Sequence, residues 1–102
     1  MLVNNVVETD LAKNVALRLF GNERVNLQGP ALTASEDFSF MLEKIPGCYF
    51  LIGNTDLGPD GVVSSDSTSS CMVHNPGYDF NDKIISIGSK YWAQLVGEYL
   101  KK

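Results

Sequence analysis

The sequence predicts a small α/β domain in which helices alternate with short strands. Apolar residues recur at helical spacing over residues 8–20 and again over residues 82–100, which indicates two amphipathic helices. Between them, residues 48–53 form a near-continuous apolar run bounded by turn-forming residues, a pattern typical of a buried strand. The expected order is helix, strand, helix, strand, helix, which favours an α/β or α+β class.

The first helix is expected over residues 8–20. Leu11, Val15 and Leu19 lie four residues apart and so share one face of a helix. Gly21 follows directly and can adopt the left-handed conformation that commonly ends a helix. The pattern therefore predicts a helix that packs through one apolar stripe.

Two shorter elements are expected after the first helix. Residues 25–27 alternate apolar and polar side chains and predict a short strand. Ser35 can then cap a second helix over residues 36–45. Glu36 and Asp37 fall in its first turn, where the positive end of the helix dipole stabilises carboxylates.

The second half of the chain contains the expected central strand, a long loop and the longest helix. The strand covers residues 48–53, and residues 54–70 are rich in loop-forming residues. A loop of this length in a compact domain is usually functional or disordered. The last helix is expected from residue 81 or 82 to residue 100, with an apolar stripe at Ile84, Ile87, Tyr91, Leu95 and Tyr99.

Length and composition indicate one globular domain over residues 1–102. Of the 102 residues, 44% are hydrophobic and 20% are charged. The formal net charge of −4, without a basic stripe, argues against nucleic acid as a partner. No apolar stretch is long enough for a membrane helix, and the first residues do not resemble a secretory signal. We therefore expect a cytoplasmic protein with no membrane partner.

The chain has two cysteines, Cys48 and Cys71. In a cytoplasmic protein both are expected to be reduced, each acting as a small buried apolar residue. A disulfide would require their Cα atoms to lie within about 7 Å. Their spacing leaves this pairing open.

Aromatic side chains are more numerous than so few elements can cover. They include Tyr49, Phe50, Tyr91, Trp92 and Tyr99. Because large exposed apolar surfaces mark interaction sites, this surplus predicts either a piece of a larger layered domain or a homo-oligomer.

The only histidine of the chain, His74, precedes a turn formed by Asn75-Pro76-Gly77. A histidine on a tight loop before a helix is well held and can point into a cleft. Imidazole is the commonest metal ligand in proteins and the commonest general base near neutral pH. A single histidine can equally be a structural or surface residue, so neighbouring motifs must decide between these interpretations.

Three segments, in order, carry a resemblance to one family. They are residues 34–41 (Ala-Ser-Glu-Asp-Phe-Ser-Phe-Met), residues 45–54 (Ile-Pro-Gly-Cys-Tyr-Phe-Leu-Ile-Gly-Asn) and residues 74–82 (His-Asn-Pro-Gly-Tyr-Asp-Phe-Asn-Asp). Together they resemble the C-terminal part of the metal-dependent amidohydrolases of the hippurate hydrolase and N-acyl-amino-acid amidohydrolase type. These enzymes belong with aminoacylase and the carboxypeptidase-type zinc exopeptidases. The resemblance covers about residues 5–100.

The resemblance implies a fold and an activity. It implies a three-layer zinc-exopeptidase fragment, with a sheet of two to four strands packed by about three helices. Residues 1–102 would form the C-terminal part of the catalytic domain, without the lid domain and the N-terminal half. The parent enzyme would hydrolyse the amide bond of N-acyl amino acids or small peptide-like substrates. It would hold one or two divalent ions, zinc or manganese.

The resemblance also implies roles for individual residues. His74 matches the last metal ligand of the family, and Asp79 or a backbone carbonyl could orient its second ring nitrogen. Glu36 and Asp37 match an acidic pair beside the site, although helix capping alone would also explain them. The helix start at Ser35 could accept a substrate carboxylate through its free amides.

The general base and the other ligands of the family are absent from these 102 residues. A catalytic zinc site takes about three protein ligands, so the isolated chain is expected to be inactive and to bind metal too weakly to retain it. One alternative is a non-catalytic α/β domain that self-associates, or binds a partner, through a surface the parent would bury. Another is a metal site shared between subunits through symmetry-related His74 residues.

Overall fold

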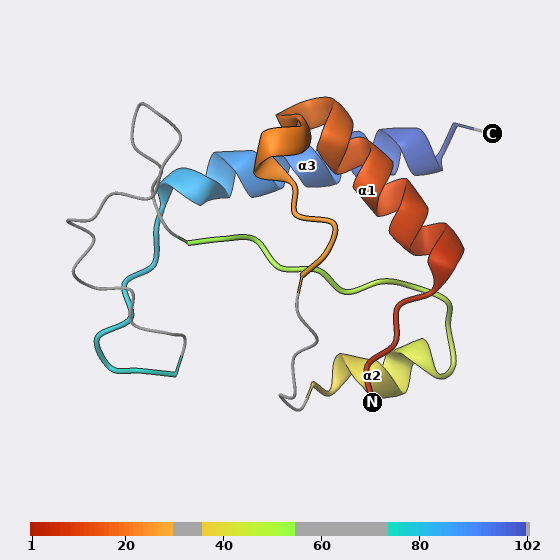
Figure 1. Cartoon of the computed structure of the whole chain (residues 1–102), viewed down its shortest axis with the longest axis horizontal. Coiled ribbons are helices and arrows are strands. Elements are labelled where there is room, and N and C mark those ends of the chain that lie inside the picture. The colour runs from red at the N-terminus through yellow and green to blue at the C-terminus, as the bar shows by residue number, and fades with distance from the viewer. Residues whose placement is uncertain (30–35, 55–73, 102) are drawn as a thin grey trace. The chain divides into compact units, whose positions relative to one another are not determined.

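The computed structural model describes residues 1–29, 36–54 and 74–101, and it separates into two compact units (Figure 1). The first unit comprises Met1–Phe50 and Lys90–Lys102, and the second comprises Leu51–Ser89. The element order is α1 (Val6–Phe20), the short 3-10 turn η1 (Asn22–Arg24), α2 (Phe38–Leu42) and α3 (Lys83–Tyr99). Ser35, Cys71 and nearly all of the long loop expected over residues 54–70 lie outside the described residues.

The α/β class predicted from the sequence is wrong for the part of the chain that the structure describes, which contains helices and no strand. The short strand expected over residues 25–27 and the central strand expected over residues 48–53 are both absent. A strand exists only through hydrogen bonds to a neighbouring strand, and none is available here. The apolar run of residues 48–53 is also not buried as expected, because Leu51 is 67% exposed and Ile52 is 50% exposed.

Two asparagine side chains take the place of a neighbouring strand beside residues 47–49. The side-chain amide of Asn4 donates to the Tyr49 carbonyl (2.8 Å), and its oxygen accepts from the Tyr49 N–H (2.7 Å). Asn5 donates its backbone N–H to the Gly47 carbonyl (3.0 Å) and accepts the Gly47 N–H through its side-chain oxygen (3.0 Å). The backbone N–H and carbonyl groups of Gly47 and Tyr49 are thus all hydrogen-bonded without a sheet.

Helix α1 forms where its apolar stripe predicts and ends at the expected glycine. Gly21 has a φ of 79°, and its N–H donates to the Leu17 carbonyl. Val15 is fully buried and Ala12 is 7% exposed. These two residues are the contribution of α1 to a small core.

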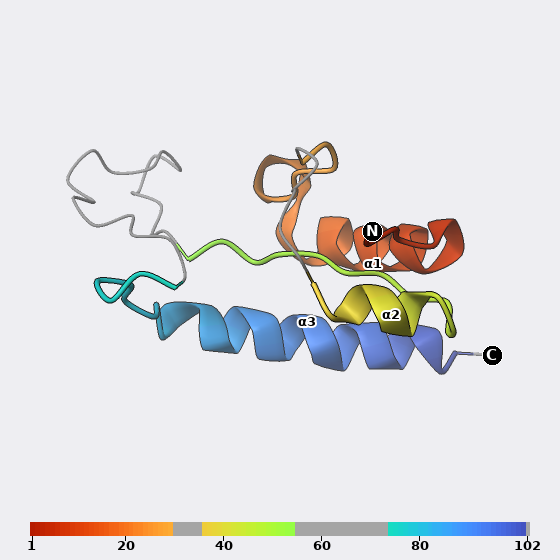
Figure 2. The same cartoon turned by 90° about the horizontal axis from the view of Figure 1, so that it is seen from below.

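The last turns of α3 pack against α1 through Tyr91, which is 5% exposed. Its hydroxyl donates to the Ala12 carbonyl (3.1 Å), and burial raises the pKa of this hydroxyl. The ring also packs against Phe20 and Phe50, at centroid distances of 6.4 and 5.1 Å. In the projection of Figure 2 the segment that follows α2 passes between α1 and α3, and its Phe50 contacts Tyr91, so this segment and both helices contribute to the core.

Glu98 adds a polar contact between the same two helices. Its Oε1 lies 2.7 Å from Arg18 Nη1 and 3.3 Å from Lys101 Nζ, and it also accepts from Gln94 Nε2 at 3.2 Å. The hydrogen bond from Lys101 and the charge of Arg18 lower the pKa of Glu98.

The structure has no helix among its described residues that is both long and apolar enough to cross a membrane.

Val15→Ala is expected to lower the free energy of unfolding by about 2 kcal/mol, because it removes two buried methyl groups and leaves a cavity. Urea denaturation followed by circular dichroism measures the change. Val7→Ala on the same helix is the matched control, since Val7 is 75% exposed, and a change below about 0.5 kcal/mol is expected there. Equal losses for the two variants would contradict the described core.

Glu98→Gln is expected to destabilise the chain near neutral pH and to matter less in acid. The folded state has the lowered pKa, so the stabilisation is fully present above the ordinary carboxyl pKa and is lost as pH falls through the folded value. Urea midpoints from about pH 7 to about pH 3 should converge for the variant and the parent. Glu43→Gln, an exposed residue after α2, is the control; a constant gap at all pH values would argue against this ion pair.

Candidate functional site

His74 lies in the second unit, exposed and in an unusual backbone conformation. Its φ of 76° is in the left-handed region, which residues other than glycine rarely adopt. The turn after it is held by Asn75, whose side-chain oxygen accepts from the Gly77 N–H (2.8 Å) and whose carbonyl accepts from the Tyr78 N–H (2.9 Å). Within the described part of the chain, the imidazole makes no hydrogen bond, so both ring nitrogens are open to a ligand.

The rest of the loop continues directly into α3. The rings of Tyr78 and Phe80 meet edge to face, with centroids 4.8 Å apart. Asn81 then accepts the Lys83 N–H through its side-chain oxygen (3.1 Å), as a helix cap does. Asp79 is exposed, and no hydrogen bond joins it to the His74 ring within this described loop, so its predicted role in orienting His74 stays a prediction.

Asn54 ends the second segment of the sequence resemblance, but sequence reasoning gave it no role. Its side chain contacts the backbone at Asp79 and Asn81, five and seven residues beyond His74. Its sequence signals are its place directly after the apolar run of residues 48–53 and at the end of the segment 45–54. No periodic pattern marks an asparagine that bonds a distant backbone, so its contacts could be found only in the structure.

Glu36 and Asp37 belong to the first unit, at the start of α2. One oxygen of Glu36 accepts from the Phe38 N–H (3.2 Å), and its carbonyl accepts from the Ser39 N–H (3.1 Å). A hydrogen bond with Glu36 also raises the pKa of the Tyr49 hydroxyl. Asp37 is the exposed N-cap residue and makes no side-chain cap bond. These contacts match the capping interpretation of Glu36, while the role of this pair beside a site stays a prediction.

The predicted site residues do not form a complete metal centre within the residues that the structure describes. His74 and Asp79 lie in the second unit, Glu36 and Asp37 lie in the first, and Ser35 is outside the described residues. No group of three or more histidine, cysteine or acidic side chains that could hold a metal occurs in the described ranges. The open imidazole of His74 fits the role of one ligand, and about three are needed.

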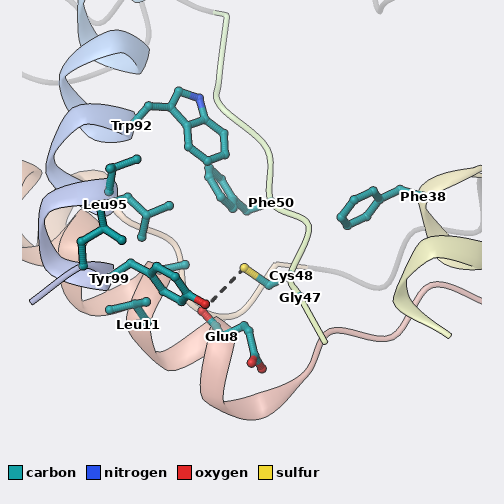
Figure 3. A pocket seen from close by; sticks show the side chains of 12 residues that line it. Glu8, Leu11, Phe38, Gly47, Cys48, Phe50, Trp92, Leu95 and Tyr99 are labelled. Atoms are coloured by element: carbon teal, nitrogen blue, oxygen red, sulfur yellow. Dashed lines mark hydrogen bonds between the residues drawn. The ribbon is translucent and has the colours of Figure 1, made fainter. Parts of the chain in front are cut away.

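A cavity of about 360 Å³ opens in the first unit between α1, the segment after α2 and the end of α3 (Figure 3). Its lining is almost entirely apolar and consists of Glu8, Leu11, Ala12, Phe38, Gly47, Cys48, Phe50, Trp92, Leu95, Val96, Tyr99 and Leu100. The Cys48 thiol donates to the Glu8 carbonyl at 3.7 Å, and burial together with the nearby Glu8 carboxylate raises the pKa of this thiol. The described lining of the cavity is therefore suited to an apolar group.

Comparison with known proteins gives consistent results over nearly the whole chain. Hippurate hydrolase of Campylobacter jejuni is 32% identical over 99 residues, which are 97% of this chain and 22% of that protein. IAA-amino acid hydrolase ILR1-like 2 of Arabidopsis thaliana is 33% identical over 100 residues, 98% of this chain and 20% of that protein. The chain thus spans about a fifth of the length of these relatives, and no solved structure matches it.

The sequence model described as peptidase family M20/M25/M40 matches residues 1–98. This match covers both units and all the motifs that carry the resemblance found in the sequence. The chain therefore belongs to peptidase family M20/M25/M40, a family of hydrolases.

Proposed function

We propose that this chain forms the C-terminal part of the catalytic domain of a metal-dependent hydrolase that cleaves the amide bond of N-acyl amino acids or small peptide-like substrates. The observation that carries this proposal is the family match over residues 1–98, because peptidases of this family are generally metal-dependent. The two relatives named above support amide substrates, since one is named for hippurate and the other for amino acid conjugates of IAA.

His74 is the residue of this chain that would contact the metal. Its ring is exposed, without a hydrogen bond among the described residues, and is carried by a turned loop that leads into α3. A divalent ion, zinc or manganese, would polarise the substrate carbonyl and lower the pKa of bound water when present. The remaining ligands and the general base would come from polypeptide outside these 102 residues, in the N-terminal half of the catalytic domain.

The acidic pair and the helix start would act around the substrate. Glu36 and Asp37 carry two carboxylates at the start of α2, and with Ser35 they would line the approach to the site. Asp79, in the same loop as His74, would accept a hydrogen bond from the imidazole once the ring is held by metal. A cytoplasmic location also stays a prediction.

A second candidate function is self-association, or binding of a partner, through a surface that the parent enzyme buries. The specific observation is the exposure of large apolar side chains around the cavity of the first unit. Phe50 is 46% exposed, Trp92 57%, Val96 53%, Tyr99 60% and Leu100 68%. Contiguous apolar surface of this kind usually marks an interface.

His74→Ala is expected to weaken zinc or manganese uptake by the full chain by about fivefold or more, because it removes the one imidazole. Equilibrium dialysis with each metal measures this. Asp82→Asn is the matched control in the same loop, since Asp82 is an exposed acidic residue, and uptake should change less than about twofold.

The same preparation, with either metal, is expected not to hydrolyse hippurate, and the Campylobacter enzyme serves as the positive control. Unchanged metal uptake in His74→Ala would contradict the proposed role of His74 as a metal ligand. Hydrolysis by the chain alone at the rate of that enzyme would show that no further polypeptide is needed.

Val96→Glu is expected to shift the chain toward monomer if the exposed surface of the first unit mediates association, because a charge at such an interface is costly to desolvate. Light scattering over a range of concentrations measures the mass. Val7→Glu is the control, since Val7 is 75% exposed on α1 and does not line the cavity. A parent chain that is monomeric at every concentration would eliminate self-association.

A further inference from the structure

We propose that Asn54 is a positioning residue that holds the loop carrying His74, here called the His74 loop and comprising residues 74–82. This inference rests on the proposed role of His74 as a metal ligand. It gives a defined positioning role to a residue for which the resemblance implied none. Asn54 itself does not contact metal or substrate in this proposal.

Three hydrogen bonds join Asn54 to the end of the His74 loop. Its side-chain nitrogen donates to the Asp79 carbonyl (2.7 Å), and its side-chain oxygen accepts from the Asn81 N–H (2.9 Å). The side chain of Asn81 donates in return to the Asn54 carbonyl (3.2 Å). All of these residues lie in the second unit.

Asparagine suits this position because one planar amide carries a donor and an acceptor side by side. It can therefore bond a carbonyl and an N–H two residues apart, as a neighbouring strand would. Aspartate keeps the acceptor for Asn81 but loses the donor to Asp79. Alanine loses both bonds, so the two substitutions separate the two contacts.

The hydrogen bonds of Asn54 affect His74 through the His74 loop, which is held by contacts of its own. The Asn75 turn fixes its start, the Tyr78–Phe80 ring contact fixes its middle, and Asn81 links its end to α3. A left-handed histidine persists only where its surroundings over-determine it. Because the Asn54 hydrogen bonds hold the end of the His74 loop, these contacts together fix the backbone conformation of His74. The backbone conformation in turn determines the direction of the imidazole.

The test uses the full chain labelled with nitrogen-15, with Asn54→Ala, Asn54→Asp and the control Asn26→Ala. Asn26 is a matched asparagine whose side-chain oxygen accepts the Gln28 N–H (2.9 Å) in an exposed turn of the first unit. Three properties are measured by NMR. They are amide exchange at Asn81, the amide-to-Hα NOE within His74, and the shifts that Co²⁺ bound at His74 induces in the loop amides.

Each measurement reports a different structural property of the His74 loop. The exchange rate reports the bond to the Asn81 N–H. A strong NOE within His74 is the signature of its positive φ. Cobalt induces large shifts only when it is held in a fixed place relative to the loop, so these shifts report how firmly the imidazole is oriented.

In Asn54→Ala we expect Asn81 to exchange about tenfold faster, since its N–H loses the hydrogen bond to the Asn54 side chain. The His74 NOE should weaken, and the cobalt-induced shifts should fall by about half or more. Cobalt affinity should change less than about twofold, because the imidazole is still available. Asn54→Asp should keep the Asn81 protection and lose less of the cobalt shifts, while Asn26→Ala should match the parent.

An unchanged NOE and unchanged cobalt shifts in Asn54→Ala would overturn the proposal. If the parent chain itself shows no cobalt shifts at the loop, the metal role of His74 fails, and the NOE and exchange rates still decide whether Asn54 positions the loop. Resonances of α1 report whether each variant is folded. Should Asn54→Ala lose them, the same criteria applied to Asn54→Asp decide.

Discussion

The backbone groups of residues 47–54 must find hydrogen-bond partners without a neighbouring strand, and this constraint shapes both units. A buried or half-buried peptide group without a partner is costly, so almost all are satisfied in folded proteins. In the first unit Asn4 and Asn5 satisfy the groups at Gly47 and Tyr49. In the second unit Asn54 makes the comparable contacts to the His74 loop. Asparagine side chains thus replace sheet pairing at both ends of one apolar segment.

The helices could be predicted from the sequence because their signal is local. The period of the apolar stripe placed α1 and α3, and Gly21 marked the end of α1. The strand over residues 48–53 was predicted wrongly because its composition is typical of a strand, while pairing depends on a partner that the described residues do not contain. Composition indicates the secondary structure that a segment prefers, whereas a strand forms only if a neighbouring strand is available to pair with it.

The candidate site was predictable to a similar degree. The sequence singled out His74 before a proline-glycine turn, and the structure places it exposed on such a turn. It included Asn54 in a motif but could not indicate its contacts, because a side-chain amide that bonds a backbone 25 residues away leaves no periodic trace. Glu36 shows the reverse case, since a residue chosen for its place in a motif makes ordinary contacts at a helix start. Family membership supports the proposed metal-dependent hydrolysis, and the local contacts indicate how this chain would hold His74 for it.

The exposed apolar segment also bears on how the chain behaves in concentrated solution. From Ile45 to Thr55 no side chain carries a charge, while Leu51 and Ile52 stand open. Lys44 and Asp56 flank this β-prone stretch but no charge interrupts it, and such a stretch can template cross-β stacking between molecules when nothing covers it. The net charge of −4 then provides the repulsion that opposes such stacking, so salt and acid should favour fibrils over dissolved protein.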